Sequence, residues 1–310
     1  MTPSPTVLRA ERLSPEQVEQ VLTLMRVAGD TDGALPLSEH VVLHLRHGGE
    51  APAVHLLIAT NQEIVGYAHV DTTDAVEGAS AEMVVHPLHR RRGLGRALVR
   101  AAIEVADEHA AGRLRLWAHG DHPSASALAI RLGFDRVRVL LQLRRSLFAP
   151  LPEVVVPQGV RLRAFVPGQD DEAWLALNAA AFADHPEQGK WTLDDLRVRI
   201  REPWFDAAGF ILAEREDRLL GFHWTKVHGD ESQAPAHEPI GEVYVLGVSP
   251  DAHGGGLGRA LTLAGLHHLR NRGLAQVMLY VDESNTRAVA LYHRLGFVRW
   301  AADVSFQRAL

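Results

Sequence analysis

The sequence predicts an α/β protein made of two tandem domains, each a mixed twisted sheet flanked by helices. Its 310 residues are long for one compact core and suit two domains of about 150 residues each. The segment VHPLHRRRGLGRAL at 85–98 recurs as VSPDAHGGGLGRAL at 248–261, and RLGF at 131–134 recurs at 294–297. Both repeats lie 163 positions apart (248 − 85 and 294 − 131), which indicates a duplicated domain.

Composition limits the classes of function. Hydrophobic residues make up 46% and charged residues 23%, so each half can bury an ordinary core. The net charge of −6 argues against a nucleic-acid partner, because binding to phosphate backbones depends on clustered Lys and Arg. The absence of cysteine excludes disulfides and thiolate metal sites and is compatible with a reducing cytoplasm. With no apolar leader or membrane-length apolar stretch, we expect a cytoplasmic monomer without a membrane partner.

The two halves meet in a proline-containing segment, FAPLPEVVVPQG at 148–159. Its three prolines disfavour helix and are typical of an extended linker. We therefore expect an N-terminal domain at 1–148, a linker at 149–158 and a C-terminal domain at 159–310.

Each half has the same elements around its glycine-rich segment. A β-branched or apolar run at 83–85 or 243–248 predicts a strand before it. An amphipathic helix is predicted after it, because apolar residues recur at helical spacing at Leu94, Leu98, Ala101 and Val105.

A second strand and helix follow in each half. The strands are expected at 114–118 and 277–281. The second helices should end at Gly133 and Gly296, because glycine is favoured where a helix terminates with positive φ. A final pair of strands, rich in apolar residues and Arg, would complete each domain.

The turn from strand into helix through glycines favours binding of an anion. Unpaired backbone N–H groups and the positive end of the helix dipole meet there, and glycines let a ligand approach the backbone. In the first half four arginines add positive charge, namely Arg90, Arg91, Arg92 and Arg96. The G-x-G-x-x-G dinucleotide motif is absent because Leu98 replaces its third glycine, and no G-K-[ST] occurs. A phosphate group is the expected ligand.

Two ordered motifs carry a family resemblance. The pattern V-x-P-x-x-[RQ]-x-x-G-x-G-x-x-L, followed by N-x-x-A-x-x-x-Y-x-x-x-G-F, resembles the GNAT superfamily of acetyltransferases. The resemblance implies two tandem GNAT-like acetyltransferase domains that use acetyl-CoA as acetyl donor. No metal is expected, because the histidines form no metal-binding pattern such as H-E-x-x-H. The resemblance also implies that the loop holds the pyrophosphate, and that the preceding strand splays from its neighbour to receive the pantetheine arm. One departure is His253, where the pattern has Gln or Arg.

The resemblance places the acetyl-CoA contacts in both halves. Backbone N–H groups around 246–248 could polarise the thioester carbonyl. The cofactor-binding residues that it implies are Met83, Val84, Val85, Arg91, Arg92, Gly93, Leu94, Gly95 and Arg96 in the first half, and Leu246, Gly247, Val248, His253, Gly254, Gly255, Gly256, Leu257, Gly258, Arg259, Asn285, Thr286, Arg287, Ala288, Val289 and Ala290 in the second.

The two copies differ where chemistry is expected. Asn285 and Tyr292 in the second copy match His122 and Ala129 in the first. Glu242 likewise matches Ala79, and Tyr280 matches Trp117. We therefore expect catalysis in the C-terminal domain, whereas the N-terminal domain keeps the acetyl-CoA loop without catalysing.

Tyr292 and Glu242 are the candidate catalytic residues. The resemblance gives Tyr292 the role of general acid toward the departing thiolate; the alternative is a core tyrosine. Glu242 would share one strand face with residues 244, 246 and 248, where it could bind an ammonium or accept its proton through water. The alternative for Glu242 is an exposed glutamate at a strand end.

A narrower resemblance concerns the acceptor. The segments PEQG, EPWFD, GFHWTKVH, GEVYVLGV and MLYVDESN resemble tandem GNAT enzymes that acetylate the cysteinyl amine of cysteinyl-glucosaminyl-inositol. The acceptor contacts that this resemblance implies are Glu39, Glu187, Lys226, Glu242 and Tyr280. Three aromatic residues nearby could equally belong to the core, namely Trp191, Trp204 and Phe205.

Two alternatives remain open on the sequence alone. The chain could acetylate another amine, such as an aminoglycoside or a protein N-terminus. It could also be a non-catalytic CoA-binding sensor, which would need neither Tyr292 nor Glu242.

Overall fold

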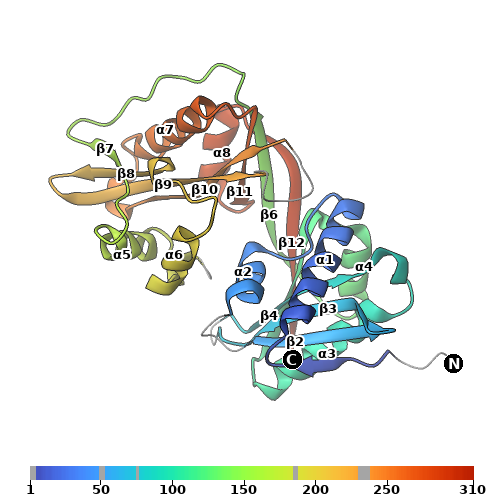
Figure 1. Cartoon of the computed structure of the whole chain (residues 1–310). Helices are drawn as coiled ribbons and strands as arrows, with labels where there is room; N and C mark the ends of the chain where they lie inside the picture. The colour runs from blue at the N-terminus through green and yellow to red at the C-terminus, as the bar shows by residue number, and fades with distance from the viewer. Residues whose placement is uncertain (1–4, 49–52, 75–76, 184–187, 230–237) are drawn as a thin grey trace. The chain divides into compact units, whose positions relative to one another are not determined.

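The computed structural model describes residues 5–48, 53–74, 77–183, 188–229 and 238–310. The chain forms two compact units: unit 1 comprises Met1–Leu141 with Ala301–Leu310, and unit 2 comprises Gln142–Trp300. In each unit, helices cover both faces of a mixed sheet (Figure 1). The predicted fold class is therefore confirmed.

The sheet of unit 1 is antiparallel except for one parallel pair. Its strands are, in spatial order, β1 (Leu8–Ala10), β2 (Ala53–Thr60), β3 (Glu63–Asp71), β4 (Ala79–Val85), β5 (Arg113–Ala118) and the unit 1 part of β12 (Val298–Ala309). β4 and β5 run parallel, whereas the pairs β1–β2, β2–β3, β3–β4 and β5–β12 are antiparallel.

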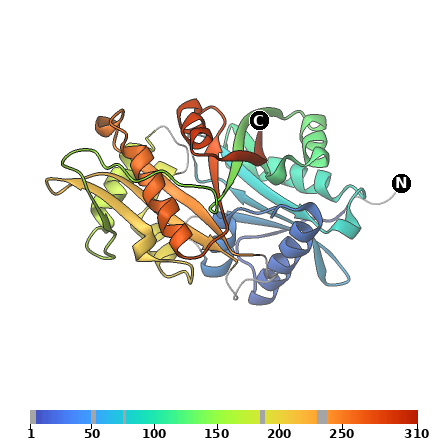
Figure 2. The same cartoon turned by 90° about the horizontal axis from the view of Figure 1, so that it is seen from above.

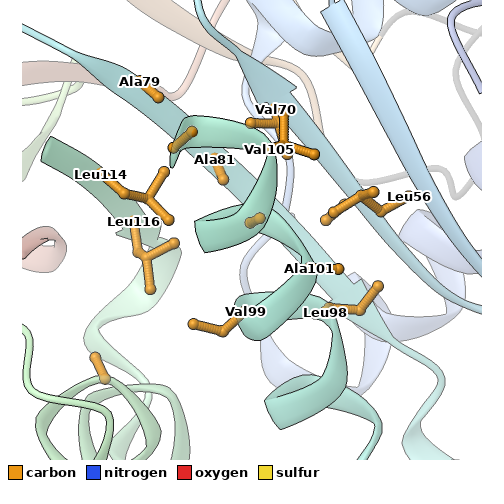
Figure 3. Packing of buried hydrophobic residues seen from close by; sticks show 14 of the residues in the cluster. Leu56, Val70, Ala79, Ala81, Leu98, Val99, Ala101, Val105, Leu114 and Leu116 are labelled. Atoms are coloured by element: carbon orange, nitrogen blue, oxygen red, sulfur yellow. The ribbon is translucent and has the colours of Figure 1, made fainter. Parts of the chain in front are cut away.

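Two layers of helices bury this sheet. α1 (Pro15–Asp32) and α2 (Glu39–His47) cover one face, and α3 (Leu94–Glu108) and α4 (Pro123–Arg131) cover the other. Figure 3 shows Leu98, Ala101 and Val105 of α3 facing the strands, as their spacing predicts. Full burial of a leucine such as Leu98 contributes about 1.5–3 kcal/mol, so this apolar face anchors α3 and the loop before it.

Unit 2 repeats this architecture. Its strands are, in spatial order, the unit 2 part of β6 (Asp135–Ser146), β11 (Gln276–Asp282), β10 (Ile240–Val248), β9 (Arg218–His228), β8 (Phe210–Arg215) and β7 (Arg161–Ala164). β10 and β11 are parallel, and the pairs from β7 to β10 are antiparallel.

The helices of unit 2 enclose an aromatic core. α5 (Asp171–Ala181) and α6 (Leu193–Ile200) cover the face that carries Trp224, and α7 (Leu257–Asn271) lies across the opposite face (Figure 2). α8 (Thr286–Arg294) follows β11. Trp204 is part of the aromatic core, and Trp191 and Phe205 pack against it. These three rings therefore have the core role that the sequence left open.

Most of the last strand, from Ala301 onward, belongs to unit 1, although the repeat assigns its residues to the second copy. In β12, Val304 pairs with Ala118 and Ala309 pairs with Arg113. Val304 and Phe306 are buried in the core of unit 1. After its second helix each copy forms one long strand, β6 or β12, rather than the predicted pair. Among the described residues, no helix is long and apolar enough to cross a membrane.

Candidate active site

The glycine-rich loop of unit 2 presents bare backbone at the start of α7. Gly254 has φ 91° and Gly256 has φ 82°, a left-handed conformation that other residues adopt at a cost. A Cβ added at Gly254, Gly255 or Gly256 would meet nothing within 4 Å, so this surface is open. Gly256 precedes α7 without a side-chain hydrogen bond to its first turn. The N–H groups of that turn can therefore bind a phosphate, as a pyrophosphate site requires.

Unit 1 has the same loop conformation. Gly93, the counterpart of Gly256, has φ 87° and precedes α3 without a side-chain cap. Arg91, the counterpart of Gly254, has φ 62° despite its side chain. The sequence repeat is thus a structural repeat, and both loops suit an anion.

His253 contacts the end of the preceding strand, as its counterpart Arg90 does in unit 1. Its Nε2 atom lies 3.1 Å from the carbonyl oxygen of Val248. In unit 1, Nε of Arg90 donates to the carbonyl oxygen of Val85 at the same distance, 3.1 Å. Arg90 also binds both carboxylate oxygens of Asp32 at 2.7 Å. The departure at His253 therefore keeps the link between loop and strand end.

The strands beside each loop separate, as the family resemblance implies. β10 pairs with β11 only as far as Val243 and Leu279, although β10 continues to Val248. β4 and β5 likewise pair only as far as Ala81 and Leu116. Beyond these points no ladder joins the two strands, and in unit 1 this leaves a slot for an extended ligand.

In unit 1 this slot is a cavity of about 610 Å³, within the usual range for small-molecule sites. Predicted acetyl-CoA contacts line it, namely Met83, Val84, Val85, Arg91, Gly93, Leu94, Gly95 and Arg96. The opposite wall comes from β5 and the residues after it, including Trp117 and His119. Arg92 is exposed and is not among the lining residues.

A β-bulge at Tyr244 changes the face that each residue of β10 presents. The pairing of β10 with β9 shifts register between Val243 and Val245. Leu246 and Val248 consequently pack on the α7 side, whereas Tyr244 packs against the aromatic core on the opposite side. The expectation that residues 242, 244, 246 and 248 share one face is therefore wrong, because a bulge interrupts strand alternation. β4 pairs with β3 in continuous register.

Glu242 is buried and paired, so it is not an exposed strand-end residue. Only 7% of it is exposed, and its Oε2 atom lies 2.6 Å from Nε2 of His228. Lys226 stands opposite Glu242 in the antiparallel pair, with Nζ 4.4 Å from the centre of the Trp204 ring. Sequence reasoning missed His228. Its position two residues after Lys226 puts it on the same strand face, which was the available signal.

Tyr280 lies on the same side of the sheet. Glu242 pairs with Met278, and Tyr280 is two residues further along β11, so strand alternation gives all three one face. The Tyr280 hydroxyl accepts a hydrogen bond from Nε2 of Gln142 at 2.6 Å. Three of the predicted acceptor contacts, Lys226, Glu242 and Tyr280, thus come together on one face.

The two remaining acceptor candidates lie elsewhere. Glu39 is the first residue of α2 in unit 1. It follows Ser38, whose Oγ atom donates to Glu82. Glu187 lies outside the described residues.

Tyr292 lies in α8 with its ring edge-on to Phe297, 5.6 Å between centroids. Burial raises the pKa of Tyr292 to about 12, so its hydroxyl keeps its proton at neutral pH. Its counterpart in α4, Ala129, is also buried. Asn285 caps α8 by accepting from the backbone N–H of Ala288 at 3.1 Å. This packing is compatible with both an acid and a core tyrosine.

Unit 1 contains a buried ionic cluster beside its cavity. His119 contacts Asp303 at 2.9 Å and Glu82 at 3.3 Å. Burial disfavours the imidazolium, but the hydrogen bonds to Asp303 and Glu82 outweigh it and raise the pKa of His119 to about 10. Across the described residues, no group of three or more His, Asp or Glu side chains is placed to hold a metal ion.

Comparisons with known proteins agree with this geometry. The model of the acetyltransferase (GNAT) family matches residues 23–134 and 174–297. The chain is 60% identical to mycothiol acetyltransferase of Salinispora arenicola over 99% of this chain and 98% of the relative. It is 56% identical to mycothiol acetyltransferase of Acidothermus cellulolyticus, covering 99% and 97%.

Solved structures share the fold. A tandem GNAT protein from the clavulanic acid biosynthesis pathway superposes with a TM-score of 0.75 at 21% identity, covering 98% of each chain. A GCN5-related N-acetyltransferase from Sphaerobacter thermophilus superposes with a TM-score of 0.70 at 24% identity, covering 99% of this chain and 97% of that one.

Proposed function

Because the chain belongs to the GNAT acetyltransferase family and, within it, to the mycothiol acetyltransferases, we propose that it acetylates the cysteinyl amine of cysteinyl-glucosaminyl-inositol. The acetyl donor is acetyl-CoA, and the product is mycothiol. The observation that carries this proposal is the face of unit 2 that holds Lys226, Glu242 and Tyr280 beside separated strands and an uncapped helix. An acceptor with one ammonium and many hydroxyls needs such carboxylate, phenol and ammonium groups.

The residues of unit 2 have separate roles in this proposal. The N–H groups at the start of α7 hold the pyrophosphate, and the separated edge of β10 receives the pantetheine arm. Acetyl-CoA supplies an activated thioester. The neutral amine attacks its carbonyl carbon, a C–N bond forms, the C–S bond breaks, and Tyr292 donates its proton to the departing thiolate. The nitrogen releases one proton to solvent as it becomes an amide, and solvent returns one proton to Tyr292. The Tyr292 hydroxyl is protonated at neutral pH and therefore has a proton to donate.

Unit 1 binds acetyl-CoA without catalysing in this proposal. Its cavity and loop can hold the ligand, whereas Ala129 stands where unit 2 has Tyr292. We also propose that the protein acts as a monomer in the cytoplasm, which agrees with its lack of cysteine.

A mass-spectrometric assay tests the function directly. Purified protein is incubated with acetyl-CoA and cysteinyl-glucosaminyl-inositol, and glucosaminyl-inositol without the cysteinyl group serves as the control acceptor. We expect one acetyl group on the cysteinyl nitrogen, located by fragmentation, and one free CoA thiol per product. Acetylation of an aminoglycoside but not of this acceptor would identify another amine as substrate. Calorimetric binding of acetyl-CoA without acetylation of any acceptor would favour the sensor.

A further inference from the structure

A chain of side-chain contacts within unit 2 leads from Tyr280 to Trp300. Nε2 of Gln142 donates to the Tyr280 hydroxyl at 2.6 Å, and Oε1 of Gln142 accepts from Nε of Arg144 at 3.0 Å. The guanidinium of Arg144 lies over the Trp300 ring, 4.4 Å from its centre. These side chains come from β11, β6 and β12, which are successive neighbours in the sheet. The face that holds Glu242 and Tyr280 therefore continues as far as Trp300.

Arg144 is a half-buried cation that no carboxylate neutralises. In the described part of the chain its Nε atom bonds to Gln142, whereas its two terminal nitrogens have neither a hydrogen-bond acceptor nor an acidic partner. Burial lowers the pKa of Arg144 below its usual value, because solvent is partly removed and no anion replaces it. A ligand that offers oxygens to the terminal nitrogens would offset this cost.

Gln142 and Trp300 give this end of the face a defined shape. Gln142 is only 9% exposed, and both polar ends of its amide are hydrogen-bonded, so it fixes the positions of the Tyr280 hydroxyl and the guanidinium. Trp300 is 64% exposed, although the guanidinium lies over its ring. An exposed indole beside hydrogen-bond donors suits a hydroxylated ring, whose C–H groups pack on the indole while its hydroxyl oxygens accept from the donors.

The length of this face suits an acceptor that contains two rings. Neighbouring strands lie about 4.8 Å apart, so the three steps from β10 through β11 and β6 to β12 cover about 14 Å. An acceptor with its amine at Glu242, an aminoacyl group and two six-membered rings extends from β10 towards β12. Such an acceptor brings hydroxyl groups to Arg144 and keeps its ammonium away from that cation.

We infer that Arg144 and Trp300 form the subsite for the ring of the acceptor that lies farthest from its amine, a cyclitol or sugar ring with neighbouring hydroxyls. This inference rests on the proposed function and adds residues that determine specificity for its substrate. The terminal nitrogens of Arg144 donate to two neighbouring hydroxyl oxygens, and the C–H groups of the ring pack on the Trp300 indole. Neither residue takes part in the chemical step, so both act through binding of the acceptor.

Removing the distal ring from the acceptor tests the subsite. Steady-state rates with acetyl-CoA are compared for cysteinyl-glucosaminyl-inositol and for cysteinyl-glucosamine, which lacks the cyclitol. Arg144→Met removes the donors and keeps an unbranched side chain against Trp300. With the full acceptor we expect kcat/KM to fall about 10-fold or more, the loss of one hydrogen bond to a charged group, through a higher KM at nearly unchanged kcat. With the truncated acceptor, Arg144→Met and wild type should have the same kcat/KM.

Arg299→Met is the matched control for the charge. Arg299 is the exposed residue before Trp300 in β12, and strand alternation places its side chain on the opposite face, so both acceptors should react as with wild type. Equal losses with both acceptors in Arg144→Met, or no loss with the full acceptor, would overturn the inference. Circular dichroism should show each variant folded, and Trp300→Ala, which removes an exposed ring, replaces Arg144→Met if that variant is not.

An NMR titration separates this inference from the proposed function. The indole N–H signal of Trp300 is assigned as the one that Trp300→Phe lacks, and cysteinyl-glucosaminyl-inositol is added without acetyl-CoA. We expect the signal to shift in wild type and to shift much less at the same concentrations in Arg144→Met. Acetylation of this acceptor without a shift, or an equal shift caused by inorganic phosphate, contradicts the inference. A shift without acetylation contradicts the proposed function instead.

Discussion

The Nε2 atom of His253 lies 3.1 Å from the carbonyl oxygen of Val248 in unit 2. The Nε atom of Arg90 lies at the same distance from the carbonyl oxygen of Val85 in unit 1. Two different side chains thus tie the loop to the end of the preceding strand. The side chain differs between the units, whereas the contact with the end of the strand is the same.

Removing this tie should weaken acetyl-CoA binding more than catalysis. His253→Ala loses one hydrogen bond, which contributes about 0.5–1.5 kcal/mol, so KM for acetyl-CoA should rise about 2- to 12-fold with kcat nearly unchanged. His253→Arg, which copies Arg90, should restore KM. Steady-state kinetics measure both, and an unchanged KM in His253→Ala would show that the tie is dispensable.

Tyr292→Phe should slow turnover without weakening acetyl-CoA binding. The substitution removes a proton donor and preserves the packing on Phe297. General acid catalysis contributes about 10²–10⁴-fold, and kcat should fall within that range. Because the pKa of Tyr292 is raised to about 12, wild-type activity should show no basic limb from this group below about pH 10. Wild-type kcat in the variant, with chemistry rate-limiting, would remove Tyr292 from the mechanism.

Bulky residues in the two loops should separate binding from catalysis. Gly258→Trp should abolish turnover by filling the pyrophosphate site of unit 2, and Gly95→Trp should leave the chemical step largely intact. Gly95→Trp should also lower Tm, since a ligand at a hundredfold excess over its Kd contributes about 2.7 kcal/mol of stability.

The matched controls are Gly258→Ala and Gly95→Ala, whose Cβ atoms would meet Val248 at 3.7 Å and Leu128 at 3.1 Å. If folded Gly95→Trp protein loses turnover while Gly258→Trp protein keeps it, the active site is in unit 1.

Stability should decline at alkaline pH because of His119. Its pKa is raised from the usual 6.5 to about 10, so its contribution is complete below pH 6.5 and is lost as the pH rises to 10. Urea denaturation at pH 7 and pH 10 should show the free energy of unfolding falling in wild type. The fall should be smaller in His119→Gln, and equal falls would show that the cluster does not titrate in this window.

Acid should destabilise the protein through histidines that burial keeps neutral. Burial lowers the pKa of His55, His69 and His223 to about 4, so the stability that depends on their neutral form is lost as the pH falls from 6.5 to 4. Nδ1 of His69 is buried without a hydrogen-bond partner. His69→Leu should therefore show a shallower loss of unfolding free energy between pH 6.5 and pH 4.5 than wild type does.

The spacing of residues within one segment predicted those parts of the site that a single segment forms. The loop glycines, the buried face of α3 and the position of Tyr292 in α8 all follow from spacing within one segment. The side of the sheet on which Leu246 packs could not be predicted from spacing. The bulge at Tyr244 adds one residue to β10 and so reverses the alternation of its side chains, and the sequence pattern does not reveal the bulge. The contact between His228 and Glu242 depends on the register of two strands across an intervening segment. No periodicity encodes such a register.

The pairing of β12 with β5 determines the order in which the chain can complete its fold. Val304 meets Ala118, 186 positions earlier in the chain (304 − 118). At about 5–20 residues per second, a ribosome needs roughly 10–40 s to synthesise that interval. During this time the nascent β5 has an unpaired edge, which is a template for aggregation. During synthesis, unit 1 therefore cannot complete its sheet until the residues that follow unit 2, Ala301–Leu310, have been made.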